Sequence, residues 1–565
     1  MLNRIVNSLA ICFTVYWIAF IFLEYWTWHP DVREAITLFQ FGGAALTLCL
    51  LAAGGGWLFL RSEAVRRRCN GLTIAGLGLV VILILLNAFF RVSLNAPLTA
   101  SENVVFIGTM LRSILPAYGM LAVCFVLGSA VMHVSSVRMP AGDFNLVKIG
   151  LGMMVVVFAL FVLGAAGLLQ AAVLIPVLVA VLVIGWRYAW QFVRTTLLNP
   201  IPVGRDFNAL GFGVFFILLT LVGMNLVQVV RPVPLGYDAI TLYVNLASLI
   251  DDYEGLVQGN QPYNWSLFIS LGYLLFGKTE TVLTLSFLGT LLSLFALYRV
   301  SRKWVNSNYA LLVVLLFYTM PMVNWLSFRD VKIDLGLLFY SLVILLLLYN
   351  WLAPEATKSK KKRKKSAKKQ RPAREWKWAV LSGLSVRIRD LVTRFSPPLI
   401  SKHQYPVLIG LFCGFAMGIK LSALLVILGL VAALWYFRDG GIVALLGACA
   451  ISIFLILAAR LDQQANLRQF HTSAHLVQWS MLLAGIAAFG YLLLRKRAVF
   501  LANLRITVII SVFTVATMAP WLAKNYLETR SLSVTALTNG KRASPSPTVR
   551  EMDRIWRTSQ TGQQQ

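Results

Sequence analysis

Residues 333–352 read IDLGLLFYSLVILLLLYNWL, and residues 358–374, shortly after them, read KSKKKRKKSAKKQRPAR. The first stretch holds one charged side chain in twenty residues, which is the length that an α-helix needs to cross a hydrocarbon core of about 30 Å. The second carries eleven Lys or Arg and no acid, so we expect it to stay on the cytoplasmic side of a membrane. Together they predict a membrane-spanning helix with a fixed direction.

Apolar segments of the same kind recur along the whole chain of 565 residues. Hydrophobic residues make up 58% of the sequence and charged residues 13%, against about half and about a quarter in soluble domains. We therefore expect an all-α fold, a polytopic transmembrane helix bundle with about fifteen spans. The expected spans cover residues 5–23, 36–60, 72–90, 114–134, 146–169, 171–190, 209–230, 281–300, 308–326, 333–352, 404–419, 421–437, 442–459, 475–494 and 504–524.

The Lys and Arg residues between these spans predict which loops face the cytoplasm. The charged loops hold Arg61, Arg66, Arg67 and Arg68, then Arg138 and Lys148, then Arg187, Arg194 and Arg205. This pattern predicts a multi-pass protein of the cell's inner (cytoplasmic) membrane, with its N-terminus inside and its C-terminus outside. The segment 5–23 lacks a small-residue cleavage site, so we expect it to be retained as a span rather than removed as a signal peptide.

The formal net charge of +29 would suggest nucleic acid as the partner of a soluble protein. Here the cations lie between apolar spans, where they meet anionic lipid headgroups, and we expect such lipids to bind the polybasic loop. We expect no nucleic-acid partner. Six scattered cysteines without paired spacing predict neither a disulfide framework nor a zinc site.

The basic loops must stay on the cytoplasmic side, and the number of membrane crossings that this allows decides how two ambiguous apolar segments are arranged. Residues 265–276 span only about 18 Å as a helix, and another crossing there would place the run 358–374 outside. We therefore predict a re-entrant or interfacial helix for them. Residues 404–437 are predicted to form two short spans, because one long span would place the basic residues 495–497 outside. This division leaves Lys420 at an outer turn.

These boundaries divide the chain into three regions. Residues 1–200 form a six-helix membrane region whose role the sequence does not indicate. Residues 201–532 form a membrane core, interrupted by the polybasic cytoplasmic loop 353–403, and residues 533–565 form a polar extracytoplasmic tail.

Only 22 residues are acidic, yet several gather on the expected outer face of the core. Charge near a membrane is costly and is often functional. These acids are Asp238, Asp251, Asp252, Glu254, Asp330 and Asp334.

Five segments of the core resemble motifs of the GT-C superfamily of membrane glycosyltransferases, which includes protein O-mannosyltransferases and the aminoarabinose transferases of lipid A. The segments are GYDAITLY at 236–243, QPYNW at 261–265 with LLFG at 274–277, KIDL at 332–335, GLFCGFAMGIK at 410–420 and PWLAKNY at 520–526. The resemblance covers about residues 205–532. Leu242 and Tyr243 replace the Tyr-His pair that is usual in the first motif, and residues 530–532 replace the usual Gly-Asn-Pro after the last.

The resemblance implies a hexosyl or pentosyl transferase that takes its sugar from a polyprenyl-phosphate donor and acts at the extracytoplasmic face. The acceptor would be a glycan, a lipid or a protein. Such a reaction needs a base for the acceptor hydroxyl and cations for the departing phosphate. Asp238 is the expected base in a direct, inverting displacement. The structural alternative is that Asp238 is the N-cap of a helix that runs to Leu249.

Lys420 is the expected phosphate ligand, and its alternative is an ammonium group that merely reaches the interface. Arg329 and Lys332 are expected to share the phosphate, or else to pair with neighbouring acids. Asp334 is either a second acidic site residue or one of those ion-pair partners. Tyr243 and Tyr263, which lie in the matching motifs, complete the expected substrate-binding residues. The glycines of 410–418 recur every four residues, so they predict close approach of another helix.

No metal ligands are assigned, but one alternative is that Asp251, Asp252 and Glu254 bind magnesium or manganese together with Asp238. Two other function classes stay open. One is a lipid or solute transporter or flippase, which would show interrupted helices and charges at mid-membrane. The other is a non-catalytic scaffold of the cell envelope.

Overall fold

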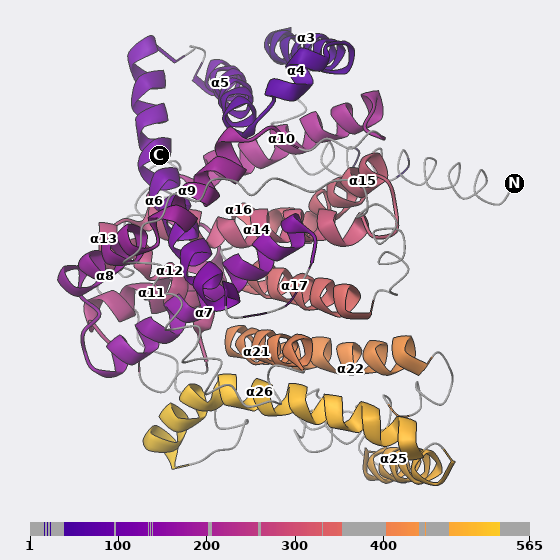
Figure 1. The fold of residues 1–565 in the computed structure, drawn as a ribbon. Helices are drawn as coiled ribbons and strands as arrows, with labels where there is room; N and C mark the ends of the chain where they lie inside the picture. Colours follow the sequence, from indigo (N-terminus) through magenta and orange to yellow (C-terminus); the bar gives the residue numbers. More distant parts are fainter. Residues whose placement is uncertain are drawn as a thin grey trace, which may run out of the picture.

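The computed structural model describes residues 39–94, 98–201, 206–257, 262–329, 332–352, 403–439 and 474–530, apart from a few single positions within them. This part is helical and contains no strand (Figure 1). Its helices are α3 Phe39–Arg61, α4 Glu63–Arg68, α5 Gly71–Leu94, α6 Ala100–His133, α7 Ala141–Ala165, α8 Ala171–Ile184, α9 Trp186–Val193, η1 Arg194–Leu198, α10 Ala209–Val229, η2 Ala239–Tyr243, α11 Val244–Asp252, α12 Asn264–Ile269, α13 Leu271–Phe276, α14 Thr279–Ser301, α15 Ser307–Tyr318, α16 Pro321–Phe328, α17 Asp334–Leu352, α21 Gln404–Ile419, α22 Ala423–Asp439, α25 Ala474–Arg495 and α26 Arg497–Thr529.

Seven of the described helices are long and apolar enough to cross a membrane, namely α5, α6, α7, α10, α14, α17 and α26. Two bent helix pairs would raise this number to nine. The expected all-α, membrane-embedded class is therefore confirmed, whereas the expected fifteen spans stay a prediction. The segments 5–23, 353–402, 442–459 and 533–565 lie largely or wholly outside the described residues, so the expectations for the first span and the polybasic loop do as well.

Two segments that we predicted as single spans, 171–190 and 308–326, are bent. The axis of α8 meets that of the run formed by α9 and η1 at 80°, and the axes of α15 and α16 meet at 75°. Gly185 lies at the first break. At the second, Pro321 begins α16, because a proline has no N–H to continue the preceding helix. The sequence expectation missed both bends, since hydropathy averages over a break of a few residues.

A buried polar network holds the second bend against α10. The side-chain nitrogen of Asn225 lies 2.6 Å from the hydroxyl of Tyr318, 2.6 Å from the side-chain oxygen of Asn324 and 3.0 Å from the hydroxyl of Ser327. These partners come from α15 and α16, on either side of the break. Because unpaired polar groups are costly in an apolar surrounding, this network favours one arrangement of the three helices.

The short segment 265–276 forms two helices, α12 and α13, which are buried among longer ones. Trp265, Phe268 and Leu271 are almost fully buried, and α12 packs against α7, α14 and α21. Gly277 ends α13 with a positive φ of 60°, a conformation that glycine adopts without steric cost. The predicted short helix is present, and it lies inside the bundle.

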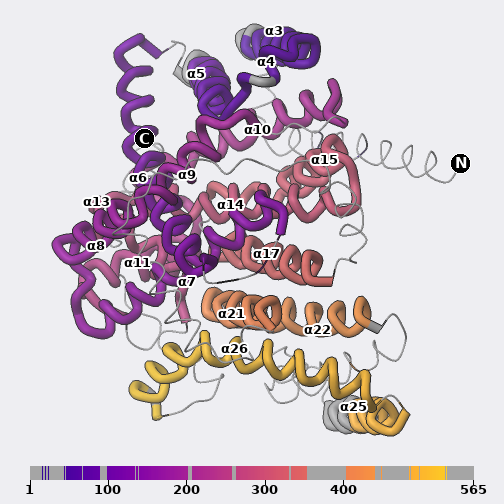
Figure 2. Tube along the Cα trace, in the orientation of Figure 1, coloured from indigo at the N-terminus to yellow at the C-terminus, as the bar shows by residue number. Residues whose placement is uncertain are grey.

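The segment 404–437 forms two helices, α21 and α22, with Lys420 between them, as the charge pattern predicted. Gly410 and Gly414 lie against the backbone of α26. A Cβ at these positions would lie 2.5 Å from the carbonyl oxygen of Ile510 and 2.3 Å from that of Thr514. The predicted close helix approach is confirmed. Figure 2 shows α17, the α21–α22 pair and α26 as successive layers of the bundle.

The two ends of α17 mark opposite ends of this part of the bundle. Asp334 is its first residue, and Asn350 lies two residues before its end, so the two are separated by about 24 Å of helix. Lys148, which we predicted as a loop cation, is instead buried within α7. Its ammonium nitrogen lies 4.9 Å and 4.7 Å from the ring centroids of Phe125 and Phe144, which compensates a buried cation by cation–π attraction.

Candidate functional site: paired charges at the start of α17

Four charged residues of the expected site meet at the Asp334 end of α17. The ammonium nitrogen of Lys420 lies 2.7 Å from a carboxylate oxygen of Asp334. The ammonium nitrogen of Lys332 lies 2.9 Å from a carboxylate oxygen of Asp238. All four side chains are between 28% and 41% exposed, so they remain accessible to a ligand while they are paired.

The two ion pairs are neighbours because Lys332 and Asp334 are two residues apart in the chain. Their Cα atoms therefore lie within about 7 Å of each other. The expected base Asp238 and the expected phosphate ligand Lys420 thus lie at the same end of the bundle. They do not pair with each other: Asp238 pairs with Lys332 and Lys420 with Asp334, two residues that the sequence also placed among the expected substrate-binding residues.

Asp238 does not act as a helix N-cap. Its backbone is already helical, with φ −66° and ψ −31°, and its side chain accepts no capping hydrogen bond. A capping residue normally has an extended backbone and accepts from an N–H two or three residues later. The carboxylate of Asp238 faces Lys332 instead, which removes the structural alternative that the sequence had left open.

Arg231, which the sequence analysis did not select, fixes the loop that carries Asp238. Its guanidinium donates to the backbone carbonyls of Gln228 at the end of α10 and of Val233 in its own loop, and to those of Phe328 and Arg329 at the end of α16. Burial, with a smaller effect from Arg329, lowers the pKa of Arg231 to about 10, so it stays charged at neutral pH. An arginine directly after an apolar span and before Pro-Val-Pro was the available sequence signal.

The other expected site residues take different positions. Arg329 is exposed and stacks on Trp325, with 4.1 Å between the guanidinium carbon and the ring centroid. Tyr243 is half-buried and ends η2.

Tyr263 is buried, and its hydroxyl accepts from the N–H of Val257 and donates to the carbonyl of the same residue. Burial raises the pKa of the Tyr263 hydroxyl. This geometry gives Tyr263 a role in holding the loop rather than an open contact with substrate.

The acidic residues at the end of α11, Asp251 and Asp252, lie far from Asp238. η2 and α11 form one helical run from Ala239 to Asp252, which spans about 20 Å. Burial, then the charges of Asp252 and Glu254, raise the pKa of Asp251. Within the described residues, no group of three or more His, Cys, Asp or Glu side chains could hold a metal ion. The alternative of a metal shared between Asp238 and these acids therefore lacks the required geometry.

A cavity of about 840 Å³ lies near this region, between residues 161–167, 253–257 and 520–528. Its polar lining includes Lys524 and Glu528, which pair at 2.7 Å. Trp521, next to Pro520 of this lining, joins α26 to α12, because its indole N–H donates to the side-chain oxygen of Asn264 at 2.7 Å. The seven expected site residues lie outside the lining of this cavity.

The chain is a helical membrane protein with a charged cluster at one end of its bundle. Comparisons with protein-family models, with curated proteins and with solved structures find no match to it.

Proposed function

We propose that this protein is a membrane glycosyltransferase that transfers a sugar from a polyprenyl-phosphate donor to a glycan, lipid or protein acceptor at the extracytoplasmic face. The observation that carries the proposal is the arrangement of Asp238, Lys332, Asp334 and Lys420 as two adjacent, partly exposed ion pairs. A carboxylate beside two ammonium groups supplies both requirements of the reaction, a base for the acceptor and cations for the leaving phosphate.

In the proposed reaction, the acceptor hydroxyl oxygen forms a bond to the anomeric carbon while the bond from that carbon to the donor phosphate breaks. The hydroxyl proton passes to the carboxylate of Asp238, and the electron pair of the broken bond leaves on the polyprenyl phosphate. One-step displacement inverts the anomeric configuration. The donor phosphate competes with Asp238 and Asp334 for Lys332 and Lys420, and this competition leaves the carboxylate of Asp238 free to accept the proton.

The test is transfer from labelled polyprenyl-phosphate sugars by purified protein in lipid vesicles. We expect Asp238→Asn to lower the rate at least about 100-fold, because general-base catalysis contributes about 10²–10⁴. Asp252→Asn, which removes the same charge about 20 Å away, is the matched control and should keep wild-type activity. Equal rates for wild type and Asp238→Asn would remove Asp238 as the base.

A transporter or flippase is the second candidate, and the two bent helix pairs favour it. Discontinuous helices often line the substrate path of transporters. The same vesicles distinguish the candidates. A flippase would move a fluorescent polyprenyl-phosphate lipid between leaflets without any acceptor. Neither the wild type nor Asp238→Asn would then transfer sugar. A scaffold would show neither activity.

A further inference from the structure

A second cavity, of about 380 Å³, lies away from the proposed site, between α3, α4, α5 and the start of α10. Its lining is almost entirely apolar and includes Gly55, Phe59, Leu77, Phe212 and Phe215. The ring of Phe59 packs 5.7 Å from that of Phe212, so aromatic side chains form much of the wall. A cavity with so apolar a lining suits an apolar ligand.

One side of this cavity is charged. Arg68, at the end of α4, lines it directly, and Arg66 lies two residues before on the same short helix. Both side chains are exposed. Within the described part of the chain, neither guanidinium group forms an ion pair or a hydrogen bond. The cavity therefore combines an apolar interior with one unpaired cation in its lining, Arg68, and a second unpaired cation, Arg66, stands on the same short helix outside the lining.

The position of the cavity fits the headgroup level of a bilayer. It lies where α3 ends and α5 begins, so its interior meets the ends of two apolar helices and its charged side faces the polar layer. Apolar chains with an attached anion are abundant at this level as phospholipids. Arginines at the interface attract such lipids by about 1 kcal/mol each.

We propose that this cavity is a binding site for an anionic phospholipid. One acyl chain fills the space between Phe59, Leu77 and Phe212, and the phosphate oxygens accept hydrogen bonds from Arg68, while Arg66 on the same short helix adds a second positive charge that attracts the headgroup. This site is independent of the proposed glycosyl transfer, since it shares no residue with the charged cluster at the start of α17.

Native mass spectrometry of the detergent-solubilised protein with added lipid tests the proposal. We expect the wild type to retain phosphatidylglycerol at least tenfold more than phosphatidylcholine of the same chains. Arg66→Gln/Arg68→Gln should reduce retention of phosphatidylglycerol on the order of tenfold, from the loss of two interfacial charges. Arg187→Gln/Arg194→Gln, which removes two exposed charges from α9 and η1, is the matched control and should retain lipid like the wild type.

A second pair of variants tests the cavity itself. A Cβ at Gly55 would lie 3.7 Å from Phe212, whereas a Cβ at Gly54 would meet nothing within 4 Å. Gly55→Leu therefore fills the cavity without a backbone clash and should lower retention of the lipid, and Gly54→Leu should not. Phosphatidylglycerol with a photoactivatable acyl chain should label peptides within residues 55–77 or 206–215.

Four results would overturn the proposal, and the first three are equal retention of the two lipids by the wild type, unchanged retention in both Arg66→Gln/Arg68→Gln and Gly55→Leu, and labelling confined to other peptides. Retention of inorganic phosphate in place of lipid would show an anion site without an acyl pocket, and would overturn it as well.

Discussion

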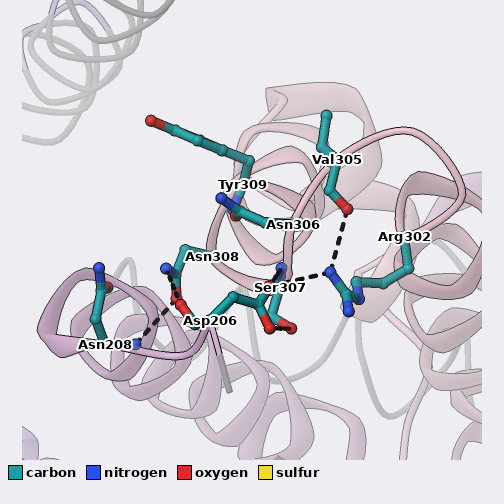
Figure 3. A network of polar contacts seen from close by, with 8 residues as sticks. All are labelled: Asp206, Asn208, Arg302, Val305, Asn306, Ser307, Asn308 and Tyr309. Atoms are coloured by element: carbon teal, nitrogen blue, oxygen red, sulfur yellow. Dashed lines mark hydrogen bonds and ion pairs between the residues drawn. The ribbon is translucent and has the colours of Figure 1, made fainter. Parts of the chain in front are cut away.

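Asp206 shows how a single carboxylate orders a turn between two helices (Figure 3). One carboxylate oxygen accepts from the backbone N–H of Ser307 and from the guanidinium of Arg302, and the other accepts from the hydroxyl of Ser307. The backbone carbonyl of Asp206 accepts from the side chain of Asn308. These contacts join the turn before α10 to the start of α15, so one residue fixes the relative position of two helices.

The pKa of Asp206 predicts a pH dependence of stability. The hydrogen bond from the N–H of Ser307 is the main cause that holds this pKa below its ordinary value of 3.8, against an opposing effect of burial. Because the folded pKa is the lower one, the stabilisation is complete above about pH 4 and disappears as the pH falls through the folded pKa. We expect Asp206→Asn to lower the midpoint of thermal unfolding at pH 7, and the difference from wild type to shrink below pH 4.

Glu280→Gln, which removes a carboxylate from the first turn of α14, is the control for this measurement. A difference between wild type and Asp206→Asn that stayed constant from pH 7 to pH 3 would contradict the proposed role of the charge.

At the scale of helices, two glycines of α21 determine how closely α21 packs against α26. Gly410 and Gly414 present no side chain, so the two backbones approach closely, and the hydroxyl of Thr514 reaches the carbonyl of Gly410 at 3.2 Å. A small residue every four positions keeps this contact on one face of α21.

Gly414→Ala tests this contact. The added Cβ would lie 2.3 Å from the carbonyl oxygen of Thr514, so backbone must shift, at a cost of about 1–3 kcal/mol. We expect a lower midpoint of thermal unfolding in detergent. Gly429→Ala in α22 meets nothing within 4 Å and should be neutral or stabilising by up to about 1 kcal/mol. Equal midpoints for the two variants would show that the α21–α26 contact tolerates a side chain.

At the scale of the molecule, charge clusters lie at both ends of α17. At its start are the two ion pairs of the proposed site. Near its end, the fully buried carboxylate of Asp143 accepts from Arg299 at 2.7 Å and from Asn350 at 3.0 Å, and it pairs with Lys303. Asp143 therefore joins α7, α14 and α17 in one cluster. Pairing keeps the net charge low at both ends of this apolar core.

Asp143→Ala should destabilise the bundle by about 3–5 kcal/mol, because it leaves partly buried cations without their partner. Urea or thermal unfolding in detergent measures the loss. The triple variant Asp143→Leu/Arg299→Met/Lys303→Met removes the whole charge group and should recover most of the stability. A triple variant as unstable as Asp143→Ala would show that packing, and not the unpaired cations, is responsible.

The sequence by itself determined the helical membrane class, the division at Lys420, the short helix at 265–276 and the close approach at Gly410 and Gly414. These features depend on hydropathy, residue size and charge along a local stretch, which the sequence contains directly. It also selected Asp238, Lys332, Asp334 and Lys420 as candidates, through their positions in motifs.

Only the tertiary structure decided which of these charges pair, where the helices at 185 and 321 bend, and that Arg231 holds the loop of Asp238. Asp334 and Lys420 are 86 residues apart in the chain, and nothing local to either residue specifies the other as its partner. Ion pairs and bends depend on how distant segments pack, because the cost of leaving a charge or a backbone group unpaired is settled by its neighbours in space.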